Sequence, residues 1–104
     1  MPSNHQLMIA VAPNGARKQQ SDHPRLPITA SEIAHTAASC VEAGACMLHL
    51  HVRDTDNRHS LDAAHYREAI AAIRREVGED LIIQITTEAV GIYTREEQMR
   101  AVIE

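Results

Sequence analysis

The 104-residue sequence has almost no aromatic side chains: it contains two tyrosines, no phenylalanine and no tryptophan. Its core must therefore be built from alanine, isoleucine, leucine, valine and methionine, which suits small-residue helices lying flat on a β-sheet. Hydrophobic residues make up 44% of the chain, which is an ordinary value for a globular protein. The length is sufficient for one small domain with one hydrophobic core.

The sequence also lacks the marks of exported, membrane-spanning and nucleic-acid-binding proteins. Residues 1–6 have neither the basic region nor the apolar stretch of a signal peptide, and no apolar run approaches the ~20 residues that cross a bilayer. The net charge is −4, and the lysines and arginines are scattered along the chain. We therefore expect a cytoplasmic protein without nucleic-acid or membrane partners, in which Cys40 and Cys46 are free thiols.

Short apolar segments bounded by turn residues predict three β-strands. These strands are expected at residues 7–12, 46–52 and 81–86. The first is followed by the turn signal Pro13-Asn14-Gly15. The second is followed by a polar segment, residues 53–60, which we expect to be a loop with a turn at residues 54–57.

Helix signals follow each predicted strand. A capping box at Thr29–Glu32 opens the first helix, which Gly44 is placed to end. The second helix ends at Gly78, and its expected inner face consists of Tyr66, Ile70, Ile73 and Val77. A second capping box at Thr94–Glu97 opens a third helix. Its expected inward-facing residues are Met99, Val102 and Ile103.

Alternation of strands and helices of these lengths predicts parallel βαβ units with right-handed crossovers. A parallel sheet must be covered on both faces or closed into a barrel, and three strands with three helices do neither. A complete (β/α)8 barrel typically needs ~250 residues. We therefore expect an α/β fold that comprises the first three βα units of a TIM-type barrel, with residues 1–104 forming the N-terminal portion of a single, truncated domain.

Two histidines share one face of the second predicted strand. Because side chains alternate along a strand, His49 and His51 share one face. The opposite face, expected to belong to the core, carries Cys46, Leu48, Leu50 and Val52. The Cα atoms of the two histidines are roughly 7 Å apart, given ~3.3 Å of rise per residue, so both rings can reach one metal ion. A pair of buried, hydrogen-bonded histidines is the alternative. The histidines expected in solvent are His5, His23, His35, His59 and His65.

Several segments around this strand resemble the β-keto acid cleavage enzymes, a family whose founding activity is the cleavage of 3-keto-5-aminohexanoate. The matching segments are residues 12–16, 26–29, 42–45, 49–53 and 84–87. The resemblance implies an eight-stranded barrel that holds Zn²⁺ through His49, His51 and a carboxylate much later in the chain. It also implies a reaction in which a β-keto acid and acetyl-CoA give acetoacetate and a new CoA thioester.

The same resemblance implies roles for residues near the strand ends. Thr86 and Thr87 occupy the positions expected to be catalytic and to grip the substrate carboxylate, while Asn14 and Arg53 are expected to contact the substrate. The full-length form is expected to be a homo-oligomer. The 104-residue chain alone is expected to be inactive, because the third metal ligand and the general base would lie beyond it.

The sequence departs from the family pattern at two positions. Many members have two glycines where this chain has Glu88 and Ala89, so Glu88 adds a carboxylate that could contact the substrate, support a ligand, replace the third ligand or lie in solvent. Arg17 stands where the amine-processing type has an acidic residue that meets an ammonium group. If Arg17 is not simply a solvated loop residue, it favours a β-keto acid with a neutral or anionic side chain.

Two other functions remain open from the residues alone. A metal-dependent hydrolase of the amidohydrolase type also uses His-x-His, but places it at the end of the first strand, whereas here a strand and a helix precede it. The chain could also be non-catalytic, as a gene remnant or a piece that needs a complementing partner. Its missing metal ligand and its uncovered sheet edges favour poor solubility or self-association.

Overall fold

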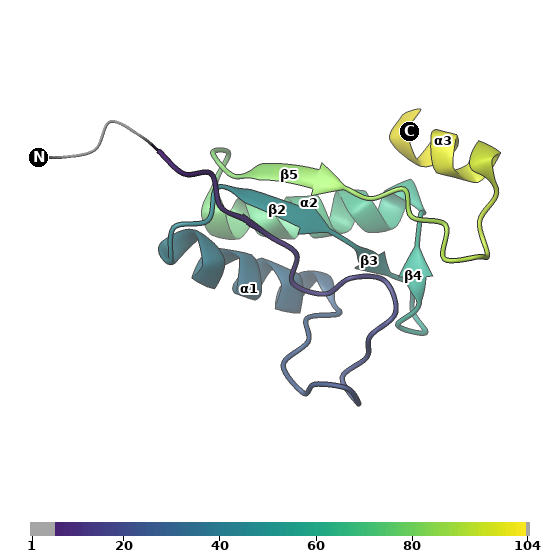
Figure 1. The fold of residues 1–104 in the computed structure, drawn as a ribbon, viewed down its shortest axis with the longest axis horizontal. Coiled ribbons are helices and arrows are strands. Elements are labelled where there is room, and N and C mark those ends of the chain that lie inside the picture. Colours follow the sequence, from purple (N-terminus) through teal and green to yellow (C-terminus); the bar gives the residue numbers. More distant parts are fainter. Residues whose placement is uncertain (1–5, 104) are drawn as a thin grey trace, which may run out of the picture.

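A computed structural model of the chain describes residues 6–103. Three parallel strands, β1 (Ala10–Val11), β2 (Met47–Leu50) and β5 (Ile82–Ile85), form one sheet in the order β1-β2-β5. Helices α1 (Ala30–Glu42) and α2 (Ala63–Val77) lie together on one face of this sheet (Figure 1). The sheet is parallel and its strands are connected through helices, so the fold is α/β, as the alternation of elements predicts.

The core lies between the sheet and these two helices. Leu48 and Leu50 of β2 are fully buried, and burial of each such side chain contributes roughly 1.5–3 kcal/mol. Alanines line both helices where they approach the sheet, which confirms the prediction of small-residue helices. The core residues contributed by the two helices are Ile33, Ala34, Ala37, Tyr66, Ala69, Ala72 and Ile73.

The helix boundaries follow the capping signals in the sequence. The Thr29 hydroxyl accepts a hydrogen bond from the Glu32 backbone N–H at 3.1 Å, and the Glu32 carboxylate accepts one from the Thr29 N–H at 3.0 Å. The same reciprocal pair joins Thr94 and Glu97 before α3 (Arg95–Ile103). Gly78 ends α2 with a φ of 81°, a conformation that favours glycine. Within residues 6–103, no helix has the length and apolar character to cross a membrane.

The predicted loop at residues 53–60 is wrong at both of its ends. Strands β3 (Val52–Arg53) and β4 (His59–Ser60) pair antiparallel there, and all four residues are buried. The predicted turn between them is confirmed. The Asp54 carboxylate accepts hydrogen bonds from the backbone N–H groups of Asp56 and Arg58 at 2.8 and 3.0 Å. The antiparallel pair of β3 and β4 turns the chain back at the carboxyl end of β2.

Two further predictions differ from the structure. Only Ala10–Val11 of the predicted first strand is a β-strand, although the Ile9 carbonyl before it accepts a hydrogen bond from the Cys46 N–H at 3.0 Å. Leu7 to Ile9 are exposed. The inward-facing prediction for α3 is wrong: Met99, Val102 and Ile103 are 61%, 62% and 80% exposed, and only Ala101 is buried. The reason is tertiary, because no element within residues 6–103 packs against that side of α3. Cys46 is half-buried rather than fully in the core, with its Sγ 3.6 Å from the Ile9 carbonyl oxygen.

Candidate metal and substrate site

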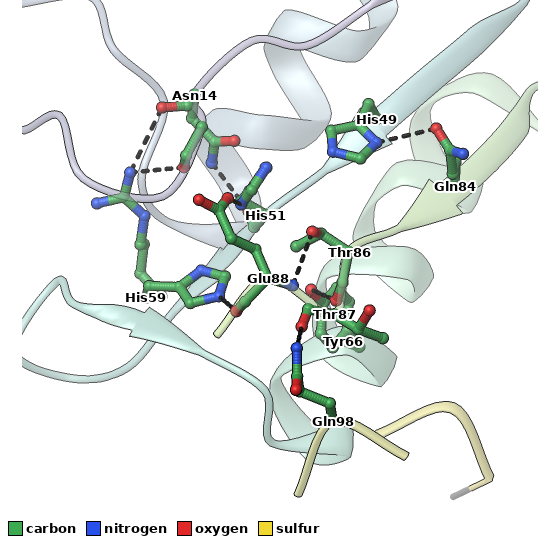
Figure 2. A network of polar contacts seen from close by, with 12 residues as sticks. Asn14, His49, His51, His59, Tyr66, Gln84, Thr86, Thr87, Glu88 and Gln98 are labelled. Carbon is green, nitrogen blue, oxygen red and sulfur yellow. Dashed lines mark hydrogen bonds and ion pairs between the residues drawn. The ribbon is translucent and has the colours of Figure 1, made fainter. Parts of the chain in front are cut away.

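His49 and His51 lie on the side of β2 that faces away from α1 and α2. Their ring centroids are 5.0 Å apart and the ring planes are inclined at 71°. The parallel register places His49 beside Gln84 of β5, and the His49 Nδ1 lies 2.9 Å from the Gln84 Oε1 (Figure 2). Because an amide oxygen only accepts hydrogen bonds, the proton of neutral His49 resides on Nδ1. Its Nε2 is left with a free lone pair, as a metal ligand requires.

His51 is 4% exposed and has no partner within hydrogen-bond distance of its Nδ1 among the described residues. The carboxylate of Glu88 is nearby, with 3.9 Å between the His51 Nδ1 and the Glu88 Oε2. Burial, followed by the like charges that His49 and His59 would carry, lowers the pKa of His51 from 6.5 to about 4. His51 is therefore neutral near pH 7, which is the state in which imidazole binds metal ions.

A third histidine, His59 on β4, adjoins this pair. It is buried, so the prediction that it is solvated is wrong. Its ring centroid lies 5.4 Å from that of His51, and its Nε2 is 2.7 Å from the backbone oxygen of Glu88. The Tyr93 hydroxyl donates to the His59 carbonyl at 3.4 Å. Nothing in the local sequence marks His59, because a two-residue strand has no periodicity to detect.

The other histidines divide between solvent and local structure. His23 and His35 are exposed, as predicted. His65 is half-buried, with its Nδ1 2.6 Å from the Ser60 hydroxyl, so the prediction of a solvated side chain is wrong for it. His5 lies outside the described residues.

Thr86 and Thr87 lie where β5 ends, beside the histidines. The buried Thr86 hydroxyl accepts a hydrogen bond from the Glu88 N–H at 3.1 Å, and its own proton remains available to a ligand. Tyr66 of α2 fixes the backbone of this segment, because its hydroxyl donates a hydrogen bond to the Thr86 carbonyl at 2.8 Å. Burial raises the pKa of Tyr66 to about 12, so this donor keeps its proton. Gln98 donates to the Thr87 carbonyl at 2.6 Å.

Asn14 and Arg53 are buried and hold the loops around the site. The Asn14 side-chain amide donates to the His51 carbonyl at 2.9 Å and to the Pro27 carbonyl at 3.2 Å. The Arg53 guanidinium donates to the Gly15 carbonyl at 2.8 Å, while its Nε has no partner among the described residues. These N–H groups already donate hydrogen bonds to backbone carbonyls. A substrate could therefore contact only the atoms that have no partner within residues 6–103, the Asn14 Oδ1 and the Arg53 Nε. Arg17 is exposed on the same loop as Asn14.

The described residues fit a zinc ion as a pair of ligands. His49 is oriented by Gln84 with its Nε2 free, and His51 is a buried, neutral imidazole whose ring centroid lies 5.0 Å from that of His49. Within residues 6–103, no three His, Cys, Asp or Glu side chains are arranged to hold a metal ion. This part of the chain therefore offers two imidazoles rather than a complete ligand set.

Comparison with known families decides the relationship of this chain. The model of the beta-keto acid cleavage enzyme family matches residues 6–104. The chain belongs to this family. A member from Fusobacterium nucleatum, named 3-keto-5-aminohexanoate cleavage enzyme, is 38% identical over 86 residues, which are 83% of this chain and 32% of that protein.

Other relatives of this chain carry different substrate names. A 3,5-dioxohexanoate:acetyl-CoA acetone transferase from Paraburkholderia graminis is 35% identical over 84% of this chain and 28% of its own length. A 3-oxoadipate:acetyl-CoA acetyltransferase from Cupriavidus necator is 34% identical over 77% of this chain and 28% of its own length. The chain thus spans 28–32% of these three relatives. The family resemblance predicted from the sequence is confirmed.

Proposed function

We propose that this chain supplies the metal-binding histidines of an enzyme that cleaves a β-keto acid with acetyl-CoA, giving acetoacetate and a CoA thioester. The observation that carries the proposal is the His49–His51 pair, oriented on the open side of a parallel sheet in a β-keto acid cleavage enzyme. The names of the relatives from Paraburkholderia graminis and Cupriavidus necator support acetyl-CoA as the co-substrate.

In this proposal His49 and His51 hold Zn²⁺, which acts as a Lewis acid on the substrate when bound. Gln84 orients His49 by accepting a hydrogen bond from its Nδ1–H. Burial keeps His51 neutral, so protonation does not compete with metal binding at pH 7.

The strand ends provide groups that suit an anionic substrate. Thr86 has a hydroxyl proton to donate, and Thr87 is half-buried next to it. The Arg53 guanidinium is buried near His51, whose pKa it helps to lower, and it has no carboxylate within 4.0 Å among the described residues. Its uncompensated positive charge favours a negatively charged ligand at this end of the sheet.

We also propose that the complete site belongs to a (β/α)8 barrel of which residues 1–104 form the N-terminal portion. The exposed apolar side of α3 and the open side of the sheet are surfaces that further βα units would cover. The third ligand would come from those units, so the 104-residue chain is expected to lack cleavage activity.

Arg17 identifies the substrate class in this proposal. Its positive charge favours a dicarboxylate such as 3-oxoadipate over the amino-keto acid 3-keto-5-aminohexanoate, because a guanidinium pairs with a carboxylate and repels an ammonium group. The Arg17→Glu variant is expected to lower the kcat/KM ratio for the dicarboxylate against the amino-keto acid by about fivefold, since an exposed charge pair contributes up to about 1 kcal/mol.

The assay follows acetyl-CoA-dependent formation of the CoA thioester from both substrates. It is run on the 104-residue chain and on the longest reading frame that contains it. Activity is expected only in the longer form, to be lost on chelation and to return with zinc. Lys18→Glu, a charge reversal at the exposed neighbouring position, is the matched control. A wild-type preference for the amino-keto acid would contradict the role of Arg17, and acetyl-CoA-independent turnover would contradict the proposed reaction.

A further inference from the structure

We propose that Glu88 is a positioning residue for the metal site: its carboxylate accepts a hydrogen bond from the Nδ1–H of His51, so that the Nε2 of His51 faces the metal. His59 holds Glu88 in place for this role. The inference rests on the proposed metal site and deepens it, because it assigns a function to the carboxylate by which this chain departs from the glycines of many family members.

The surroundings of His51 select one tautomer. Its Nδ1 is buried, lacks a hydrogen-bond partner and lies 3.9 Å from the Glu88 Oε2. A lone pair on that nitrogen would face a carboxylate anion and be repelled, whereas an N–H at the same place is attracted. Neutral His51 therefore carries its proton on Nδ1 and leaves Nε2 unprotonated.

The backbone of Glu88 is fixed on both sides by side chains. The His59 Nε2 donates to its carbonyl oxygen at 2.7 Å, and the Thr86 hydroxyl accepts from its N–H at 3.1 Å. In Figure 2 the Glu88 side chain extends from this anchored backbone toward His51. The side chain itself is 49% exposed, so it has room to rotate. In the proposed arrangement a rotation of this side chain shortens the 3.9 Å separation to a hydrogen bond.

The arrangement around His51 matches the one around His49. The Gln84 Oε1 accepts a hydrogen bond from the His49 Nδ1–H at 2.9 Å, and the Glu88 carboxylate is placed to do the same for His51. Both imidazoles then bind through Nε2, with a side-chain oxygen behind each ring. Acceptors of this kind orient metal-binding histidines and increase their basicity, and their loss typically weakens metal affinity by 10–100-fold.

The first test reads the tautomer directly. Long-range ¹H–¹⁵N correlation spectra of the metal-free 104-residue chain identify which nitrogen of His51 is protonated. We expect the Nδ1–H form in the wild type and in Glu88→Gln, whose amide oxygen still accepts, and a shift toward the Nε2–H form in Glu88→Ala. Glu76→Ala, at an exposed position on α2, is the matched control and should leave the spectrum of His51 unchanged. An Nε2–H form in the wild type would overturn the proposal.

The second test measures zinc affinity by competition with a colorimetric chelator. Glu88→Ala should bind zinc 10–100-fold more weakly than the wild type, Glu88→Gln should recover most of that loss, and Glu76→Ala should match the wild type. If zinc binding requires His49 and His51 but Glu88→Ala binds zinc within twofold of the wild type, the role of Glu88 is refuted and the metal site stands. Zinc binding that requires neither histidine would instead refute the metal site.

Discussion

Replacing His49 or His51 with alanine is expected to weaken zinc binding by at least ~100-fold, because loss of a residue behind a ligand already costs 10–100-fold and each of these residues is itself a ligand. The two rings are 5.0 Å apart on the open side of the sheet, and each is expected to contribute its own nitrogen to the metal. Loss of either histidine therefore removes one ligand. The dissociation constant is measured by chelator competition on the metal-free chain at pH 7.5.

The matched control for these variants is His35→Ala, which removes an exposed imidazole from α1. It should bind zinc as the wild type does. Far-UV circular dichroism checks that each variant keeps its helices. If His49→Ala and His35→Ala bind zinc equally well, the ligand assignment is wrong.

Lowering the pH from 6.5 to 4 is expected to reduce the free energy of unfolding of the metal-free chain by about 3 kcal/mol through His51 alone, at roughly 1.4 kcal/mol per pKa unit. The pKa of His51 is 6.5 in the unfolded chain and about 4 in the folded one. Between these values the unfolded chain binds a proton that the folded chain does not, so unfolding is favoured as the pH falls. Above pH 6.5 both states are neutral and the contribution is constant.

The measurement is a series of urea denaturation curves between pH 7.5 and 4, compared with those of His51→Gln, which cannot titrate. The wild type should lose stability more steeply than the variant. The interval from pH 6.5 to 5 is decisive, because Glu32, whose pKa is lowered by its hydrogen bond from the Thr29 backbone, titrates below its ordinary value of 4.5. Parallel pH dependence of the two proteins would contradict the burial of a neutral His51.

The features that the sequence predicted correctly are those that depend on neighbouring residues. The capping boxes at Thr29 and Thr94 form within one helical turn, so their residues alone determine them. The common face of His49 and His51 follows from the two-residue period of a strand. The family resemblance added the expectation of a zinc site, which local patterns alone left open between metal ligands and buried histidines.

The features that escaped prediction depend on contacts between distant segments. Gln84 reaches His49 only through the register of β2 with β5, across 35 positions of sequence. His59 is buried because β4 pairs with β3 and because Glu88 arrives from beyond α2. The exposed side of α3 shows the opposite case: Met99 follows a helical pattern of apolar residues, yet no described element covers it.

X-ray absorption spectroscopy of the zinc-loaded chain tests the metal site most directly. Two imidazole nitrogens at about 2.0–2.1 Å from zinc are predicted for the wild type. One imidazole should remain in His49→Ala and in His51→Ala, and two in His35→Ala. A wild-type spectrum without imidazole scattering, or one that does not change when His49 and His51 are replaced, would contradict the assignment of these residues as the metal-binding pair.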